Sequence, residues 1–128
     1  MNWDYAAGFM DADGSIGFFH EYGTPRPCIS ASQTTEEVLI QLKSLFSDIG
    51  GIYHRDIGAL YVFRATGTKM LPILKELVPR LIVKQPQCLR LIEFIECRTN
   101  GRHNKPIDEH CKDLVTANTF VGKHAFLK

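Results

Sequence analysis

The stretch YAAGFMDADGS, residues 5–15, decides the fold prediction because it places two carboxylates and two glycines behind a run of small residues. A helix built on residues 6–8 has almost no side chain on one face, so a second helix backbone can approach it closely. Gly14 is expected to end that helix, since glycine accepts the left-handed C-terminal conformation without penalty. Asp11 and Asp13 would lie at the negative end of the helix dipole, which suggests a cation nearby. The alternative is a short amphipathic helix with an ordinary Asp-Gly turn.

Length and composition favour one domain spanning residues 1–128. The chain of 128 residues is 45% apolar, which suits a single buried core. It has neither an apolar run of membrane-spanning length nor a signal-peptide pattern, so we expect a soluble, intracellular-type protein with no membrane partner. Net charge is +1, but residues 1–50 carry two basic and seven acidic side chains, whereas residues 51–128 carry thirteen and seven. Basic character therefore lies in the later part, although ordinary surface charge would also explain it.

The four cysteines lack CxxC spacing, so reduced and mostly buried thiols are expected. A zinc site is the minor alternative, although its spacing fits no standard pattern. Its ligands would be Cys97, His103, His110 and Cys111.

Apolar spacing and turn residues predict an α+β protein of order αββαββα with a further C-terminal helix. The predicted strands cover residues 15–22, 28–33, 52–56 and 60–65, with residues 23–27 as a turn because two prolines interrupt a ladder. Helices are predicted from residue 34 or 35 to 49 and over residues 68–78, 86–98 and 108–118.

Helices on one face of a four-stranded sheet leave the other face free, and strand alternation predicts what it presents. In residues 60–65, Tyr61, Phe63 and Ala65 are expected to face inward, so Arg64 faces outward. On the other strands, Tyr53 and Arg55 share one face, and Arg26, Ser30 and Ser32 share one parity.

Residues 6–14 resemble the signature nonapeptide of the LAGLIDADG homing endonucleases: six positions match, and Ala, Phe and Met replace three apolar letters. Two further runs, Ser-Gln-Thr-Thr at 32–35 and Leu-Ile-Val-Lys-Gln-Pro-Gln at 81–87, resemble segments of the homodimeric branch. The resemblance covers about residues 3–98, the expected core, with a helical extension over about 107–128.

The resemblance implies a saddle-shaped antiparallel sheet that lies in the major groove of double-stranded DNA, where base pairs present distinct hydrogen-bonding patterns. Its candidate DNA-binding residues are Ser15, Arg26, Ser30, Ser32, Tyr53, Arg55, Arg64 and Thr66. A solvated sheet face is the alternative for these side chains.

The resemblance also implies Mg²⁺-dependent phosphodiester hydrolysis that leaves short 3′ overhangs, with Mn²⁺ as a substitute metal. Asp13 would be the direct metal ligand, assisted by the backbone carbonyl of Ala12. Gln33 would order water near the metal, and Lys84 would stabilise phosphate charge or activate water. An exposed linker lysine is the alternative for Lys84. Glu37 is a departure, because relatives carry a basic active-site residue there.

One copy of the signature implies a homodimer that cuts a long pseudo-palindromic site, encoded by a mobile intron or intervening sequence of organellar, prokaryotic or phage origin. Ala7, Gly8 and Asp11 are the candidate dimer-interface residues. Two alternatives keep the fold: an intron RNA maturase, the only one with an RNA partner, and a DNA-binding regulator without cleavage. Basic residues after position 68 are compatible with the maturase.

Overall fold

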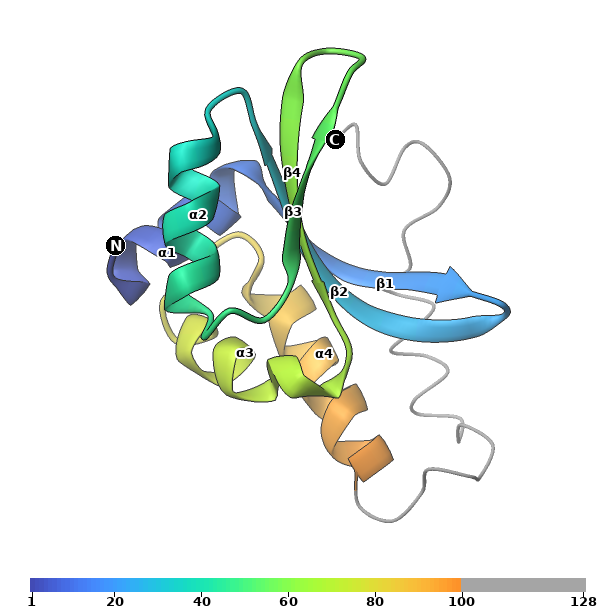
Figure 1. Cartoon of the computed structure of the whole chain (residues 1–128). Helices are drawn as coiled ribbons and strands as arrows, with labels where there is room; N and C mark the ends of the chain where they lie inside the picture. Colours follow the sequence, from blue (N-terminus) through green and yellow to red (C-terminus); the bar gives the residue numbers. More distant parts are fainter. Residues whose placement is uncertain (100–128) are drawn as a thin grey trace.

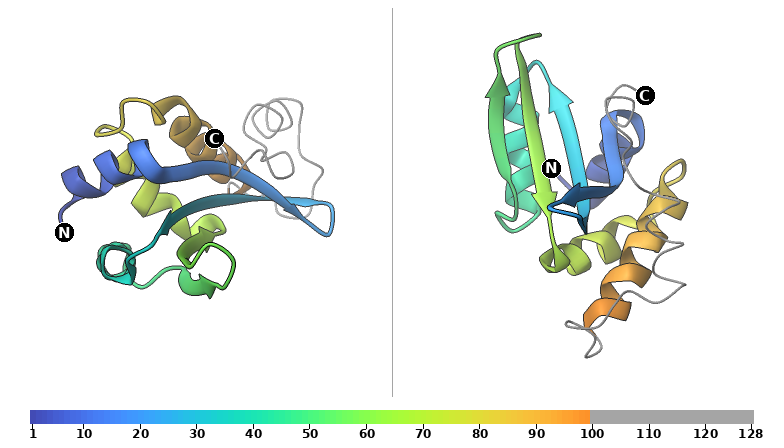
Figure 2. Two further views of the ribbon diagram at one scale, coloured as in Figure 1. Left: turned by 90° about the horizontal axis from the view of Figure 1, so that it is seen from above. Right: turned by 90° about the vertical axis from the view of Figure 1, so that its right-hand side faces the viewer.

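Two antiparallel hairpins build the sheet, as the alternating pattern predicts. β1 (Gly14–Glu21) pairs with β2 (Thr24–Gln33), and β3 (Gly51–Arg55) pairs with β4 (Leu60–Thr66). Because β2 also pairs antiparallel with β4, the strand order is β1-β2-β4-β3. The computed structural model describes residues 1–99 of the chain. The two hairpins point in different directions, which curves the sheet into a saddle (Figures 1 and 2).

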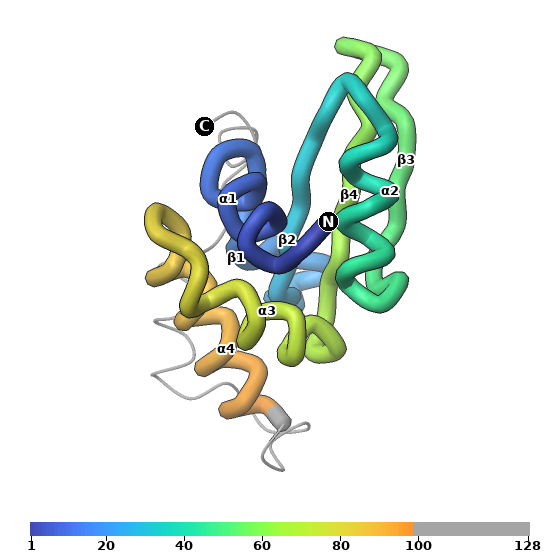
Figure 3. Tube along the Cα trace, turned by 90° about the vertical axis from the view of Figure 1, so that its left-hand side faces the viewer, coloured from blue at the N-terminus to red at the C-terminus, as the bar shows by residue number. Residues whose placement is uncertain are grey.

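Helices alternate with the hairpins along the chain and lie on one side of the sheet, the side that Figure 3 views. One helix precedes the first hairpin, one joins the hairpins, and the others follow the second hairpin. Their bounds are α1 Trp3–Asp13, α2 Glu36–Leu45, the 3₁₀-helix η1 Thr68–Met70, α3 Leu71–Leu77 and α4 Gln85–Thr99. The predicted αββαββα order with a further helix is confirmed.

The core fills the space between these helices and the sheet, and aromatic contacts tie its parts together. Phe46, just after α2, stacks on Trp3 of α1 and meets Phe63 of β4 edge to face, with ring centroids 5.7 Å apart in both pairs. Phe18 of β1 meets Phe94 of α4 edge to face at 4.8 Å. Such pairs add about 0.5–1.5 kcal/mol each to the burial of their area. The helices are therefore fixed to one face of the sheet.

The first hairpin turns in two residues, so the prediction of a loop over residues 23–27 is wrong. Tyr22 and Gly23 have φ of 53° and 78°, the paired positive values of a tight hairpin turn. Pro25 and Pro27 lie within β2, opposite residues of β1. The Pro27 carbonyl accepts a hydrogen bond from the Gly67 N–H at 3.1 Å, on the β4 side. Because a residue's N and C=O point to the same side of a strand, neither proline interrupts the ladder with β1.

The helix boundaries differ from the prediction mainly at α2 and α3. α2 ends at Leu45 rather than at residue 49, and the chain then turns through Ser47 and Asp48, which have φ of 57° and 60°. The predicted helix over residues 68–78 is split into η1 and α3. The predicted helix at residues 108–118 and the extension over about 107–128 lie outside the described residues. Within the part of the chain that the structure describes, no helix is long and apolar enough to cross a membrane.

Candidate functional site

Strand register places all eight candidate DNA-binding side chains on the sheet face opposite the helices. The core side chains of the sheet, such as Ile29 and Phe63, have the other parity. One row of outward positions crosses three strands, because Ser30 pairs with Ser15 on one side and with Arg64 on the other. The register therefore gives one shared face to Ser15, Arg26, Ser30, Ser32, Tyr53, Arg55, Arg64 and Thr66.

No helix among residues 1–99 covers this face, which is called the free face below, and two of its arginines contact neighbours on β1. The Arg64 guanidinium lies 5.5 Å from the centroid of the Phe19 ring, so Phe19 supports it from β1. Arg26 Nε lies 2.7 Å from Glu21 Oε1 across the hairpin. Phe19 and Glu21 lie on the same face as Arg26 and Arg64. This shared parity is the sequence signal that could have identified the two neighbours. The face therefore has a guanidinium beside an aromatic ring near its middle and an ion pair toward the hairpin tip.

Cys28 forms part of the floor of the same face. Its side chain is buried and pairs with Thr66 across the β2–β4 ladder. Burial raises the pKa of the Cys28 thiol to about 11, although the nearby positive charge of Arg64 acts in the opposite direction. The thiol is therefore protonated at neutral pH and does not act as a nucleophile.

Asp13 ends α1 and is exposed, next to the free face. Gln33 at the end of β2 donates from Nε2 to Asp13 Oδ2 at 2.9 Å, although the two residues are twenty positions apart. Gly14 follows with φ −91°, so the helix ends in an extended residue and not in the predicted left-handed one. Glycine is still required, because a Cβ there would lie 2.4 Å from the Met10 side chain and 2.9 Å from its Cα. The helix therefore runs directly into β1.

Asp11 is not an unsatisfied carboxylate at the end of a helix. It accepts hydrogen bonds from the backbone N–H groups of Ile82, Val83 and Lys84 at 2.7, 3.1 and 2.9 Å. The Lys84 ammonium also donates to the backbone carbonyl of Asp11. The partners come from the segment between α3 and α4, about seventy residues later in the chain. Asp13, Gln33 and Lys84 are therefore brought to one place, the C-terminal end of α1.

The oxygen donors at this place suit a hard divalent cation only in part. Asp13 offers a carboxylate, and Mg²⁺ is bound in many proteins by one or two carboxylates together with water and phosphate oxygens. Among residues 1–99, no three His, Cys, Asp or Glu side chains are grouped closely enough to hold a metal by themselves. Within residues 1–99, one protomer therefore offers a single exposed carboxylate at this place, that of Asp13. Of the alternative zinc ligands, only Cys97 lies among the described residues.

The exposed strip of α1 shares only Gly8 with the predicted dimer interface, because Ala7 is buried and the Asp11 carboxylate is bound within the protomer. Ala7 is 1% exposed and belongs to the protomer's own core, together with Ala6 and Met10. Gly8 is exposed, and a Cβ added to it would meet nothing within 4 Å. Tyr5 and Ala12 are also exposed and follow the same helical spacing as Gly8. The small-residue strip that a partner could approach is therefore Tyr5, Gly8 and Ala12, with Ala7 excluded.

Glu37 stands in the first turn of α2 and is exposed, where it accepts a hydrogen bond from Gln41 Nε2 at 3.2 Å. This position of α2 therefore carries an acidic side chain, where the family resemblance leads us to expect a basic active-site residue.

Solved structures show what this arrangement resembles. I-Vdi141I, an archaeal intron-encoded homing endonuclease complexed with DNA, matches with a TM-score of 0.72 and 23% identity over 97% of this chain and 91% of that chain. I-CvuI, in complex with its target in the presence of Ca, matches with a TM-score of 0.68 and 23% identity over 78% of this chain and 69% of that chain. The LAGLIDADG meganuclease I-AabMI, bound to uncleaved DNA, gives 0.74 and 16%, over 92% of this chain but 45% of that one. No protein-family model and no curated protein sequence matches the chain. The chain therefore has the fold of the LAGLIDADG homing endonucleases.

Proposed function

We propose that two copies of this chain bind double-stranded DNA and cleave it at one long pseudo-palindromic site, with Mg²⁺ bound. The observation that carries the proposal is the convergence of Asp13, Gln33 and Lys84 on the C-terminal end of α1, beside the free face of the sheet. The fold supports it, because the similar structures include I-Vdi141I complexed with DNA and I-CvuI with its target.

The free face of the sheet would lie in the major groove. A curved antiparallel sheet fits that groove, where each base pair shows a different pattern of donors and acceptors. Arg64 is suited to a base contact, since Phe19 fixes its guanidinium before DNA arrives and an arginine fork matches guanine. Arg26 and Arg55 lie farther along the hairpins and suit phosphate or outer base contacts.

The Asp13 carboxylate and the Ala12 backbone carbonyl would hold Mg²⁺, or Mn²⁺ in its place. When bound, the metal supplies an activated water and neutralises charge on the phosphate. Gln33 binds one Asp13 oxygen through Nε2, which orients the carboxylate and leaves the Gln33 amide oxygen to order a water. The Lys84 ammonium lies at the same helix end, where it would stabilise negative charge on the scissile phosphate.

A homodimer would complete this site. One protomer supplies one exposed Asp13 and no three-ligand group within residues 1–99, so a second Asp13 is the natural source of a further carboxylate. The exposed strip of Tyr5, Gly8 and Ala12 would allow two α1 helices to meet closely. The structural match covers 92% of this chain but only 45% of I-AabMI, so two copies of this chain would have about the length of that protein. Each protomer would then cleave one strand and leave short 3′ overhangs.

The maturase alternative receives less support from the later basic residues. Lys75 lies 3.1 Å from Glu96, and Arg80 contacts both Asp4 and Glu76. These pairs reduce the positive potential that a phosphate backbone would need on the helical side of the molecule.

The test is incubation of the full chain with a randomised double-stranded DNA library in Mg²⁺ or EDTA, followed by sequencing of cut ends. We expect cuts at one pseudo-palindromic site in Mg²⁺ only. On the selected site, Asp13→Asn should lower cleavage by at least about 100-fold, the scale of losing one electrostatic catalytic group. Asp48→Asn, the same change at an exposed position after α2, is the matched control. Enrichment without cutting would favour the regulator, and cleavage by Asp13→Asn at the parent rate would refute the assigned chemistry.

A further inference from the structure

The Asp11 carboxylate is the centre of the contacts that hold the segment before α4. Ile82 N–H donates to Oδ2, and the N–H groups of Val83 and Lys84 both donate to Oδ1. Lys84 is held at a second point, because its ammonium donates to the Asp11 main-chain carbonyl. A single residue of α1 therefore binds both the backbone and the side-chain terminus of Lys84.

Burial does not explain the position of this segment. Leu81 is buried, but the next two side chains, Ile82 and Val83, are 84% and 66% exposed. Apolar contacts thus fix the segment as far as Leu81 and contribute little to the two residues after it. Between Leu81 and Gln85, whose Nε2 donates to the Val78 carbonyl at 2.8 Å, the hydrogen bonds to Asp11 tie the segment to α1.

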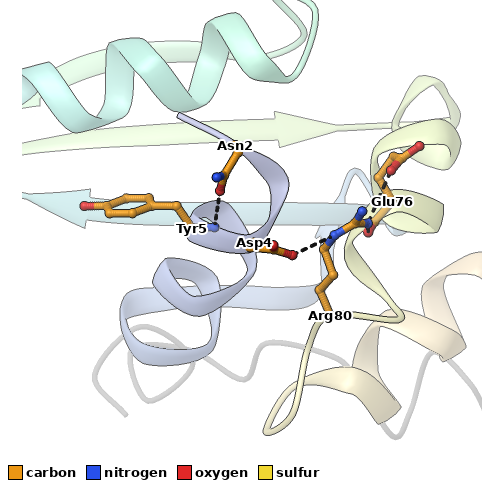
Figure 4. A network of polar contacts seen from close by, with 5 residues as sticks. All are labelled: Asn2, Asp4, Tyr5, Glu76 and Arg80. Carbon is orange, nitrogen blue, oxygen red and sulfur yellow. Dashed lines mark hydrogen bonds and ion pairs between the residues drawn. The ribbon is translucent and has the colours of Figure 1, made fainter.

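A second tie lies two helical turns earlier on α1. Arg80 Nε contacts Asp4 Oδ1 at 3.1 Å, and its Nη1 contacts Glu76 Oε1 at 3.3 Å (Figure 4). Asp4 and Asp11 are seven residues apart and so lie on one side of the helix. The segment from Arg80 to Lys84 therefore follows α1, with an exposed ion pair at one end and the three N–H groups at the other.

We infer that Asp11 is the positioning residue for Lys84, an inference that rests on the proposed endonuclease function. Asp11 precedes Asp13 by two residues in the same helix turn, so a lysine bound to Asp11 keeps a fixed place relative to the Asp13 carboxylate. The ammonium also lies at the negative end of the α1 dipole, where a positive charge is favourable. Asp11 thus acts on the reaction through Lys84 and holds no metal.

Asparagine at position 11 tests this role with a minimal change of shape. Its amide has one acceptor oxygen, and its NH₂ would face N–H donors of the segment, so at least one of the three bonds is lost. A small displacement of a catalytic group costs up to about 100-fold in rate. We therefore expect Asp11→Asn to lower single-turnover cleavage of the selected site by about 10- to 100-fold, with DNA affinity in EDTA unchanged.

Two further readouts separate positioning from a general structural role. Acetylation of DNA-free protein, mapped by mass spectrometry, should show Lys84 becoming more reactive relative to exposed Lys69 in Asp11→Asn. In a double-mutant cycle, Asp11→Asn should add little to the cleavage defect of Lys84→Met, because both remove the same contribution. Asp4→Asn is the matched control: it removes the Arg80 tie in the same helix and should leave Lys84 acetylation and cleavage unchanged. If Asp11→Asn does not fold, Asp11→Ser, which keeps one acceptor, replaces it.

Unchanged Lys84 reactivity in a folded Asp11 variant, or additive defects in the cycle, would overturn the inference. A wild-type protein that cuts no DNA would instead refute the endonuclease proposal. The acetylation ratio would then still decide whether Asp11 positions Lys84, since it requires neither DNA nor metal.

Discussion

Substituting Gly8 should strengthen folding of the protomer while weakening its self-association. Gly8 lies in the middle of α1, is exposed, and leaves open space around an added Cβ. Glycine in a helix interior costs about 1 kcal/mol relative to alanine, so Gly8→Ala should raise the free energy of unfolding of the isolated protomer by up to about 1 kcal/mol. In a dimer joined through α1, the same position is a close contact between two helix backbones.

The larger variant Gly8→Leu gives a magnitude for the dimer. Forcing a side chain into a packed contact costs about 1–3 kcal/mol, and a two-fold interface contains the position twice. The penalty of about 2–6 kcal/mol corresponds to a dimer dissociation constant raised by at least about 30-fold. Ser44→Leu, which adds the same side chain at an exposed position of α2, is the control.

Sedimentation velocity over a concentration series measures the association, and urea unfolding at a concentration where the protein is monomeric measures the protomer. The low concentration matters because dimerisation itself adds apparent stability. We expect weaker dimerisation in the sedimentation experiment together with a higher free energy of unfolding of the protomer in urea. A Gly8→Leu protein that dimerises like the parent would refute the placement of the interface on the strip of Tyr5, Gly8 and Ala12.

Three other predictions follow from the packing and the pKa values. Gly50→Ala should destabilise the protein by about 1–3 kcal/mol, because Gly50 has φ +102° and an added Cβ would lie 2.8 Å from the Arg64 carbonyl. The neighbouring Gly51 has open space and tolerates alanine, so Gly51→Ala is the control. Equal urea midpoints for the two variants would contradict the prediction. Arg64→Lys keeps the charge but loses the fork over Phe19, so it should weaken binding of the selected DNA about 10-fold without changing the salt dependence; unaltered affinity would exclude a base contact. Burial raises the pKa values of Cys28 to about 11 and Cys88 to about 12, so the unfolded chain loses these protons first and stability should fall above pH 9 by up to about 1.4 kcal/mol per pH unit for each thiol. Urea unfolding at pH 8–10 checks this fall, and Cys28→Ala should lessen it.

The sheet could be predicted from the sequence because each strand carries its own alternation. In β4, Phe63 and Ala65 fix which face meets the helices, and Arg64 then has to point the other way. The prolines of β2 were misleading for a physical reason. A proline forbids a ladder bond on one side of a strand only, and the sequence does not show that the partner of residues 25–27 lies on the other side.

The site was predictable in its residue types more than in its contacts. The family resemblance implies that Asp13 and Gln33 share one site, and the two side chains are hydrogen-bonded. The partners of Asp11 lie 71 to 73 residues away and are backbone N–H groups, which every segment of a chain offers. Ala7 is buried within the protomer, and because small side chains occupy both faces of α1, composition does not tell the buried face from the exposed one.

The two prolines of β2 also bear on how the protein behaves at high concentration. The ladder between β2 and β4 ends at Cys28. In residues 24–27, the side of β2 that faces away from β1 is therefore a strand edge. Such edges recruit further strands and begin aggregation. Proline at positions 25 and 27 removes the N–H donors along that edge. The hairpin can therefore project from the body of the molecule without becoming a template for another chain, and a variant with alanine at both positions should lose solubility before it loses fold.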